Sequence, residues 1–307
     1  MAASSSVGAA GRRRVGAAER RDWVLFGALV GPNLLLFAAF TYWPLLYNAY
    51  LSLVRWDMLA PVKTWVGLDN YTFLVRSSEF RGVLANTIVF AVASVGLVCV
   101  FGLAMALALN QPLRGRDLAR AVIYAPAMLS GAAIGLVWMY ILDPCYGLLD
   151  TFIRFLGRRS PDWLLDTTWA MPAIVLVYVW KNVGYAVIIY IAGLQAIPQT
   201  LHEAARVDGA GLWARFRHVT LPGLSPITFF LVLTNVLASF QAFDVVKVMT
   251  DGGPVGATTT LAYYLYREGF VAFNSGRAGV AAVVLFIGML TFTLMQMRLT
   301  QSRVHYA

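Results

Sequence analysis

Six apolar runs, each close to 20 residues or longer, follow one another along this sequence with short polar segments between them. Coiled into an α-helix, a run of that length matches the hydrocarbon core of a bilayer, which is about 30 Å thick. Only 13% of the residues are charged, against roughly 25% in a soluble domain. The sequence therefore predicts an all-α, polytopic transmembrane helical bundle, with spans near 23–46, 83–109, 119–142, 169–194, 223–246 and 277–297.

The distribution of arginine and lysine indicates how the bundle is oriented. Residues 1–22 carry five arginines and lack the features of a cleaved leader, so we expect an unstructured basic tail that stays in the cytoplasm. With that tail inside, about 13 basic residues fall in cytoplasmic segments and about 10 in the longer outer segments, as the positive-inside rule requires. We expect a multi-pass protein of a bacterial cytoplasmic membrane with both termini in the cytoplasm, residues 23–307 forming one membrane domain, and inward-facing loops at 110–118 and 195–222.

Several other classes of function lack the residues that they would need. The net charge of +9 comes from basic residues that lie mostly between the apolar runs, where they contact lipid headgroups, so we expect no nucleic-acid partner. Cys99 lies in a span and Cys145 in a loop, which predicts neither a disulfide nor a metal site. None of the three lysines follows a glycine, so a phosphate-binding G-x-x-x-x-G-K-[ST] loop is absent. If ATP drives this protein, another chain hydrolyses it.

The loop at 195–222 contains the most specific pattern. Residues 203–209 read E-A-A-R-V-D-G, and after nine residues the segment 219–222 reads V-T-L-P. A short helix at 201–207 would end at Gly209, where a left-handed backbone is often needed. A second amphipathic segment at 212–219 would place Leu212, Phe216 and Val219 on one side and would end at Pro222.

This pattern is similar to the EAA loop of binding-protein-dependent ABC importer permeases, with Val219 where isoleucine is usual. The resemblance implies the type I ABC importer permease fold and a transport subunit that is not itself an enzyme. It also implies a second homologous permease, two ATPase subunits that hold ATP and Mg²⁺, and an extracytoplasmic solute-binding protein, with no cofactor in this chain. In the family the loop couples to the ATPase, and the matching positions are Glu203, Ala204, Ala205, Arg206, Asp208, Gly209, Leu221 and Pro222.

Further segments resemble the carbohydrate-uptake branch, which includes the maltose and glycerol-3-phosphate permeases. They are 67–71, 144–149, 250–254 and 258–266. Arg116 and the segments 180–185 and 263–268 look closest to the glycerol-3-phosphate or glycerophosphodiester type. The resemblance therefore implies import of a sugar, glycerol-3-phosphate or a glycerophosphodiester, with a neutral oligosaccharide such as trehalose or maltose as the alternative.

The two spans that flank the loop carry polar residues, which are costly in lipid and usually face a bundle interior or a cavity. Asn235, Ser239 and Ala242 recur at i, i+4 and i+7 and so share one helix face. In maltose-type permeases the sugar is contacted from these same two spans. The path residues predicted here offer hydrogen bonds and aromatic faces to a hydroxylated substrate; they are Trp180, Lys181, Asn182, Gly184, Tyr185, Asn235 and Ser239.

Two sets of basic residues each have two interpretations. Lys181 could be the partner of a phosphate-bearing substrate, or it could pair with Asp244 or extend to the membrane interface. The outer-loop arginines 154, 158 and 159 could dock the solute receptor or simply be solvated.

Three rival functions remain open from the residues alone. An ion-driven secondary transporter would need acidic residues at mid-span, and Asp244, near a span end, is the one candidate. A membrane enzyme would need paired carboxylates or metal ligands within the bundle, which the spans lack. An exporter would not depend on an external binding protein.

Overall fold

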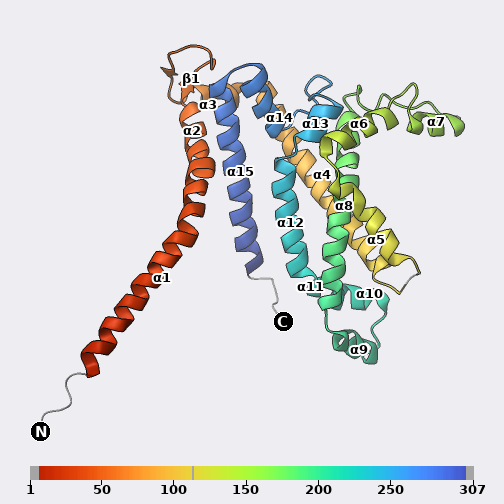
Figure 1. Cartoon of the computed structure of the whole chain (residues 1–307). Coiled ribbons are helices and arrows are strands. Elements are labelled where there is room, and N and C mark those ends of the chain that lie inside the picture. Colours follow the sequence, from red (N-terminus) through yellow and green to blue (C-terminus); the bar gives the residue numbers. More distant parts are fainter. Residues whose placement is uncertain (1–6, 113, 302–307) are drawn as a thin grey trace, which may run out of the picture.

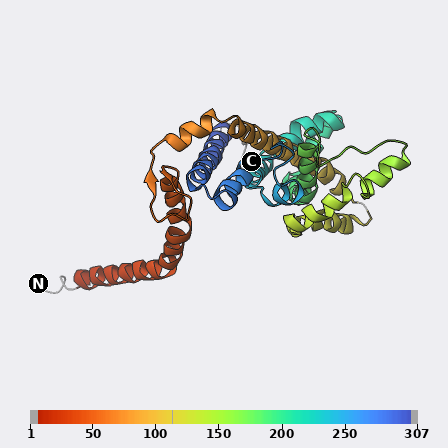
Figure 2. The ribbon, with the colours of Figure 1, turned by 90° about the horizontal axis from the view of Figure 1, so that it is seen from above.

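The computed structural model describes residues 7–112 and 114–301, which form a helical bundle with one small antiparallel sheet (Figures 1 and 2). The two strands are β1 (Val54–Arg55) and β2 (Thr64–Trp65). The helices are α1 (Val7–Phe37), α2 (Trp43–Leu51), α3 (Asp69–Arg76), α4 (Ser78–Leu109), α5 (Arg116–Tyr124), α6 (Gly131–Ile141), α7 (Leu148–Phe155), α8 (Ala170–Ala196), α9 (Gln199–Val207), α10 (Leu212–Arg215), α11 (Leu221–Gly223), α12 (Ser225–Phe240), α13 (Asp244–Met249), α14 (Leu261–Tyr266) and α15 (Ser275–Gln301). Short π-helical turns lie at Ala38–Tyr42, Phe216–Thr220 and Arg267–Val271, and a 3-10 turn lies at Ala125–Met128.

The expectation of an all-α membrane bundle is confirmed. Within the described residues, four helical stretches are long and apolar enough to cross a bilayer, and two bent pairs pass the same test together. Counting each pair as one span gives six segments in the predicted order. The four continuous stretches are Arg21–Leu51, Ser78–Leu109, Ala170–Ala196 and Ser275–Arg298, and the bent pairs are Arg116–Met128 with Gly131–Ile141, and Leu212–Gly223 with Ser225–Phe240.

The third predicted span, 119–142, is not one continuous helix. Its two halves meet at an angle of 103°. Pro126 has no N–H to donate, so the helix tightens into the 3-10 turn, and Ser130 is extended before α6 begins at Gly131. At Gly131 a Cβ would lie only 1.6 Å from the Asp244 carboxylate, so glycine allows α13 to pack against the start of α6.

The fifth predicted span, 223–246, is shorter than expected. It bends by 61° between α11 and α12, and α12 ends at Phe240. The last turn tightens because the Ala242 N–H donates to Ser239 and the Gln241 N–H donates to Ala238. Asp244 therefore lies outside this span, at the start of the separate helix α13.

The N-terminal segment differs from the unstructured tail that we expected. Residues 7–22 belong to α1, because the alanine-rich and arginine-rich sequence there consists largely of good helix formers. From residue 21 to Leu51 this stretch is a candidate span, and none of the residues in its most apolar part is buried within the chain. Figure 1 shows α1 extending away from the other helices.

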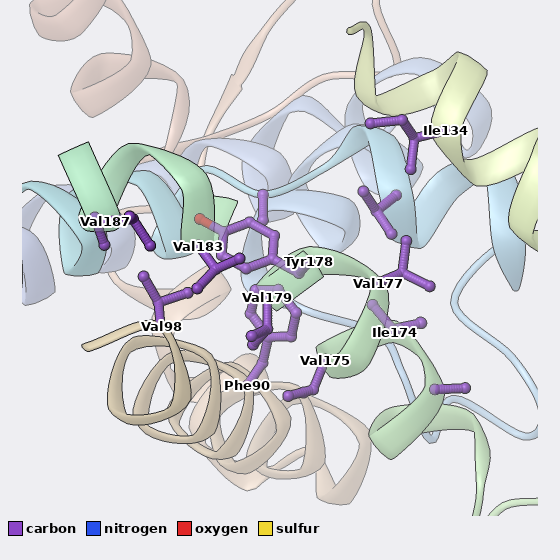
Figure 3. Packing of buried hydrophobic residues seen from close by; sticks show 14 of the residues in the cluster. Phe90, Val98, Ile134, Ile174, Val175, Val177, Tyr178, Val179, Val183 and Val187 are labelled. Carbon is purple, nitrogen blue, oxygen red and sulfur yellow. The ribbon is translucent and has the colours of Figure 1, made fainter. Parts of the chain in front are cut away.

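The main core forms where α4 and α8 cross. Phe90 and Val98 of α4 face a row of valines on α8, and Tyr178 meets Phe90 edge to face with the ring centroids 5.0 Å apart (Figure 3). Ile134 of α6 packs at the outer end of the same cluster. A second cluster joins α3, α4, α14 and α15 through residues such as Leu74, Tyr264 and Val280. The helix α8, which carries most of the predicted path residues, is thus the most enclosed of the four continuous candidate spans.

Candidate functional site

The loop at 195–222 folds into two short helices joined by a defined turn. At the end of α9 the Ala210 N–H donates to Ala205 and the Gly209 N–H donates to Arg206, which is the Schellman arrangement. Gly209 has a φ of +75°, so the predicted left-handed conformation is confirmed. Beyond α10 the chain continues through a π-helical turn into α11, where Pro222 lies at the helix start. The loop is therefore a compact, hydrogen-bonded knob.

The knob lies at one end of the bundle, opposite α13, α14 and the small sheet (Figure 1). Seven of the eight predicted coupling residues are exposed there, and Ala205 is half-buried. Apolar side chains flank the Gly209 turn, with Val207 89% exposed, Leu212 81% exposed and Trp213 also exposed. The knob thus presents apolar and charged side chains together, which is typical of a protein contact surface. The exposed set comprises Glu203, Ala204, Arg206, Asp208, Gly209, Leu221 and Pro222.

The second half of the knob differs in detail from the predicted amphipathic segment. Phe216 and Val219 are half-buried, but Leu212, which we expected on the same side, is exposed. Arg215, which we expected on the solvent side, is half-buried and its Nε is enclosed without a hydrogen bond among the described residues. The change follows from the π-helical turn at Phe216–Thr220, which shifts the helical register.

The predicted path residues on α8 lie in two different environments. Trp180 packs edge to face against Trp138 with the centroids 5.4 Å apart, and it lines two apolar cavities of about 590 and 320 Å³. Gly184 instead lies against α5, because a Cβ there would be 2.2 Å from the Ile123 carbonyl oxygen. The Asn182 amide donates to the Tyr178 carbonyl of its own helix, and Tyr185 is exposed.

On α12, Asn235 and Ser239 are buried, as their shared helix face suggested. Each donates a hydrogen bond to its own helix, Asn235 to Leu231 and Ser239 to Val236. Neither lines the two cavities beside Trp180, and the cavity of about 390 Å³ between α4, α12 and α15 is wholly apolar in its lining. The predicted path residues of α8 and α12 thus lie on neighbouring helices, but none of these three cavities is lined by both sets.

The pairing of Lys181 with Asp244 is absent. Among the side chains that the structure describes between residues 21 and 298, no ion pair within 4.0 Å includes Lys181. Asp244 lies on α13, where its carboxylate accepts from the Val245 N–H. Because α12 ends at Phe240, Asp244 lies instead at the start of α13, half-buried with its carboxylate against Gly131 of α6.

One group of charged residues was missed by sequence reasoning. Glu268 is buried between Arg267 and Arg277, at 3.5 and 3.7 Å, and Arg267 also pairs with Glu79 at the start of α4. These contacts join α4, the turn after α14 and the start of α15. The adjacent Arg267-Glu268 pair ahead of the last span was a signal in the sequence, but its partners are distant along the chain. In the described residues no cluster of three or more histidine, cysteine or acidic side chains could hold a metal ion.

Comparisons with known proteins identify relatives over most of the chain. The family described as "binding-protein-dependent transport system inner membrane component" matches residues 99–305. The sn-glycerol-3-phosphate transport system permease protein UgpA of Agrobacterium fabrum is 34% identical over 91% of this chain and 95% of its own length. The protein of the same name from Brucella abortus is 35% identical over the same shares. The probable ABC transporter permease protein YurN of Bacillus subtilis is 34% identical over 86% of this chain and 92% of its own length.

Solved structures agree on the fold. A bacterial ABC transporter that imports the acidic polysaccharide alginate has a chain that matches with a TM-score of 0.78 and 24% identity, covering 94% of this chain and 99% of that one. The same kind of transporter in complex with an alginate-bound periplasmic protein matches with a TM-score of 0.81 and 22% identity, over 94% and 98%. The fold is therefore that of a type I ABC importer permease. The chain belongs to the family of binding-protein-dependent transport system inner membrane components, and it is a permease subunit of an ABC importer, a transport component rather than an enzyme.

Proposed function

We propose that this permease moves a glycerol-phosphate compound, sn-glycerol-3-phosphate or a glycerophosphodiester, from an extracytoplasmic solute-binding protein into the bacterial cytoplasm. The observation that carries the proposal is the identity of 34–35%, over 91% of the chain, with permeases named for sn-glycerol-3-phosphate. In the proposed assembly a second related permease completes the path. Two ATPase subunits, which hold ATP and Mg²⁺, bind the knob at 195–222, and both termini lie on the same cytoplasmic side.

The exposed surface of the knob supports its role as the ATPase contact. Apolar side chains at Val207, Leu212 and Trp213 surround a turn that the Gly209 hydrogen bonds hold rigid. A rigid helix–turn–helix unit moves as one body when the protein in which it is seated closes. Glu203 and Arg206 on the exposed face of α9 add charges that would fix the orientation of the partner.

Leu212→Asp tests this contact. Because Leu212 is 81% exposed, the variant should fold normally. It should nevertheless lose the ATPase subunits on purification, or reduce solute-stimulated ATP hydrolysis by at least about tenfold, which corresponds to about 1.4 kcal/mol. The matched control is Leu165→Asp, an apolar residue 74% exposed in the outer loop, which should leave both measurements unchanged. Normal ATPase binding and hydrolysis in Leu212→Asp would remove the coupling role.

The position of Lys181 supports a phosphate-bearing substrate. A lysine in a span usually has a protein partner, and no described side chain supplies one at Lys181 within 4.0 Å. A substrate phosphate would supply the missing charge. The neighbouring Trp180, Asn182 and Tyr185, with Asn235 and Ser239 on α12, remain the proposed path residues, while Gly184 would act by letting α5 approach α8.

Transport into proteoliposomes that hold the complete importer tests the substrate. sn-Glycerol-3-phosphate should stimulate ATP hydrolysis, and maltose or trehalose should not. If both kinds of solute stimulate hydrolysis, Lys181→Met decides between them, because it should reduce uptake of the phosphorylated solute far more than uptake of the neutral one. Equal loss for both solutes would contradict the phosphate role of Lys181, and stimulation by maltose or trehalose alone would favour the neutral-oligosaccharide alternative.

A further inference from the structure

Helix α7 has an apolar face that no part of the described chain covers. It lies between α6 and α8, in the segment that links two membrane-spanning elements. Leu148, Phe152 and Phe155 recur at i, i+4 and i+7, so they share one face, and Leu156 extends it. All four are exposed, and Phe155 reaches 86%. Four large apolar side chains within nine residues form an unusual surface for a loop in water.

The structure holds this face outward rather than leaving it loose. On the opposite side of α7, Asp150 is only 3% exposed, and its carboxylate forms an ion pair with Arg154, whose Nε lies 2.8 Å from Oδ2. The helix ends in a second Schellman arrangement, in which the Arg158 N–H donates to Ile153 and the Gly157 N–H donates to Arg154. Gly157 has a φ of +74°. The burial of Asp150 shows which side of α7 faces the rest of the chain, and the Schellman turn fixes where the helix ends.

The location of α7 indicates what covers its apolar face. The end of α6 closes the bent pair counted as the third candidate span and the start of α8 opens the fourth, so α7 lies in the segment that joins the ends of two candidate spans. Figures 1 and 2 place α7 at the rim of the bundle, on the side opposite α1. Tyr146 and Trp169 are exposed on either side of it, as aromatic residues at a membrane interface are. From these positions we expect the apolar face of α7 at the level of the bilayer surface.

The charges next to α7 point to the same partner. Arg154 is paired with Asp150, but Arg158 and Arg159, directly after the helix, have no acidic partner within 4.0 Å among the described side chains. A helix with one apolar face and flanking cations binds the boundary between headgroups and acyl chains. A solute-binding protein that dissociates in each cycle would leave the face in water part of the time, whereas lipid covers it continuously.

We propose that α7 is an interfacial helix of the outer leaflet, with Leu148, Phe152 and Phe155 among the acyl chains and Arg158 and Arg159 on anionic phospholipid headgroups. It anchors the outer end of the α6–α8 connection to the bilayer. The proposal assigns Arg158 and Arg159 to lipid rather than to the solute receptor. It does not depend on which solute is transported.

Spin labels measure this placement in the complete importer reconstituted in lipid nanodiscs. Single cysteines at Phe152→Cys and Phe155→Cys are introduced into a Cys99→Ser, Cys145→Ser background. Each label is probed with oxygen, which concentrates in the acyl region, and with a nickel chelate, which stays in water. Oxygen should dominate at both positions, and at Leu148→Cys as a further label on the same face. Val255→Cys, fully exposed in another outer loop, should favour the nickel chelate.

The other occupants give distinct results. A nickel-dominated signal at Phe152 and Phe155, equal to that at Val255, would place α7 in water and overturn the proposal. Exclusion of both probes would show a protein interface with the second permease or the receptor, which also overturns it. Thr151→Cys, on the polar flank of the same helix, should be more accessible to nickel than Phe152→Cys.

The headgroup contact has its own measurement. Adding phosphatidylglycerol to neutral nanodiscs should raise the oxygen-to-nickel ratio at the Phe155 label by at least about twofold, because each arginine near an anionic surface gains about 1 kcal/mol. Arg158→Gln with Arg159→Gln should abolish that rise. If the ratio at the Phe155 label does not respond to phosphatidylglycerol when both arginines are intact, the role of the arginines is refuted.

Discussion

Gly184→Ala tests whether α5 packs against α8 as closely as the structure shows. The added Cβ would lie 2.2 Å from the Ile123 carbonyl oxygen and 2.8 Å from the Tyr124 Cα. An ordinary carbon–oxygen contact is about 3.3–3.6 Å. Since both neighbours are backbone atoms, they cannot turn aside, and α5 must move from α8 by about 1 Å. Overpacking of this kind costs about 1–3 kcal/mol.

The control is Gly96→Ala in α4, where a Cβ would meet nothing within 4 Å. There alanine should stabilise the helix by about 0.5–1 kcal/mol. The two substitutions are chemically identical, so the difference in stability between them isolates the contact of α5 with α8. We expect Gly184→Ala to be less stable than Gly96→Ala by about 1–3 kcal/mol, the cost of the contact alone, because both variants share the gain in helix propensity.

The half-buried thiol of Cys99, which packs on the main core, supplies the assay. In a Cys145→Ser background, a thiol-reactive fluorophore reports thermal unfolding when Cys99 becomes accessible in the detergent-solubilised protein. Gly184→Ala should unfold at a clearly lower temperature than the parent, and Gly96→Ala at the same or a higher one. If Gly184→Ala unfolds together with Gly96→Ala, the close approach of α5 to Gly184 is wrong.

Three further substitutions test other parts of the fold. Glu268→Gln leaves two arginines, each about a third exposed, without their buried partner, and should lower stability in thermal unfolding by about 3 kcal/mol. The control Glu79→Gln removes an exposed pair and should lower stability by less than about 1 kcal/mol. Equal losses would contradict the buried network. Gly209→Ala forces alanine into a left-handed φ, which costs about 1–2 kcal/mol, and should weaken solute-stimulated ATPase activity. The control Gly211→Ala, at a position with an ordinary φ and open space, should leave that activity unchanged. The Lys247 ammonium and the Tyr263 hydroxyl hold the pKa of Asp251 below its usual range. The contribution of Asp251 to stability is therefore present above the unfolded pKa of about 3.9 and is lost as the pH falls through the lower folded value. The difference in unfolding temperature between the parent and Asp251→Asn should be constant from about pH 5 to 8 and should shrink below about pH 4.

The parts of the fold that depend on local sequence could be predicted. Apolar run length located all six segments, and Gly209 and Pro222 marked the turn and the restart of the knob because both act through their own backbone. The break of the third span was also signalled locally, by Pro126 and by Ser130-Gly131, but the uninterrupted apolar composition concealed it.

Contacts between distant segments could not be predicted in the same way. Gly131 accommodates Asp244, and Gly184 accommodates Ile123, but a glycine in an apolar run does not reveal which backbone approaches it. The Lys181–Asp244 pair, one of the alternatives for Lys181, is absent for a related reason, since hydropathy extended the fifth span past Phe240 and placed Asp244 within it. The i, i+4, i+7 spacing of Leu148, Phe152 and Phe155 could be recognised as one helix face only once the bounds of α7 were known.

Close packing at both ends of the knob connects it mechanically to the helices of the predicted path. At the end of α8, a Cβ on Gly193 would lie 2.7 Å from Ile227 and 3.0 Å from Leu224, so α8 and the start of α12 are in close contact there. Gly223 lies equally near Ile197, where α8 has just ended. Because close-packed elements shift together rather than deform, a force applied to the knob must move α8 and α12 as one unit. Those two helices carry every predicted path residue, so closure of the proposed ATPase subunits would reach the proposed path without any flexible intermediate.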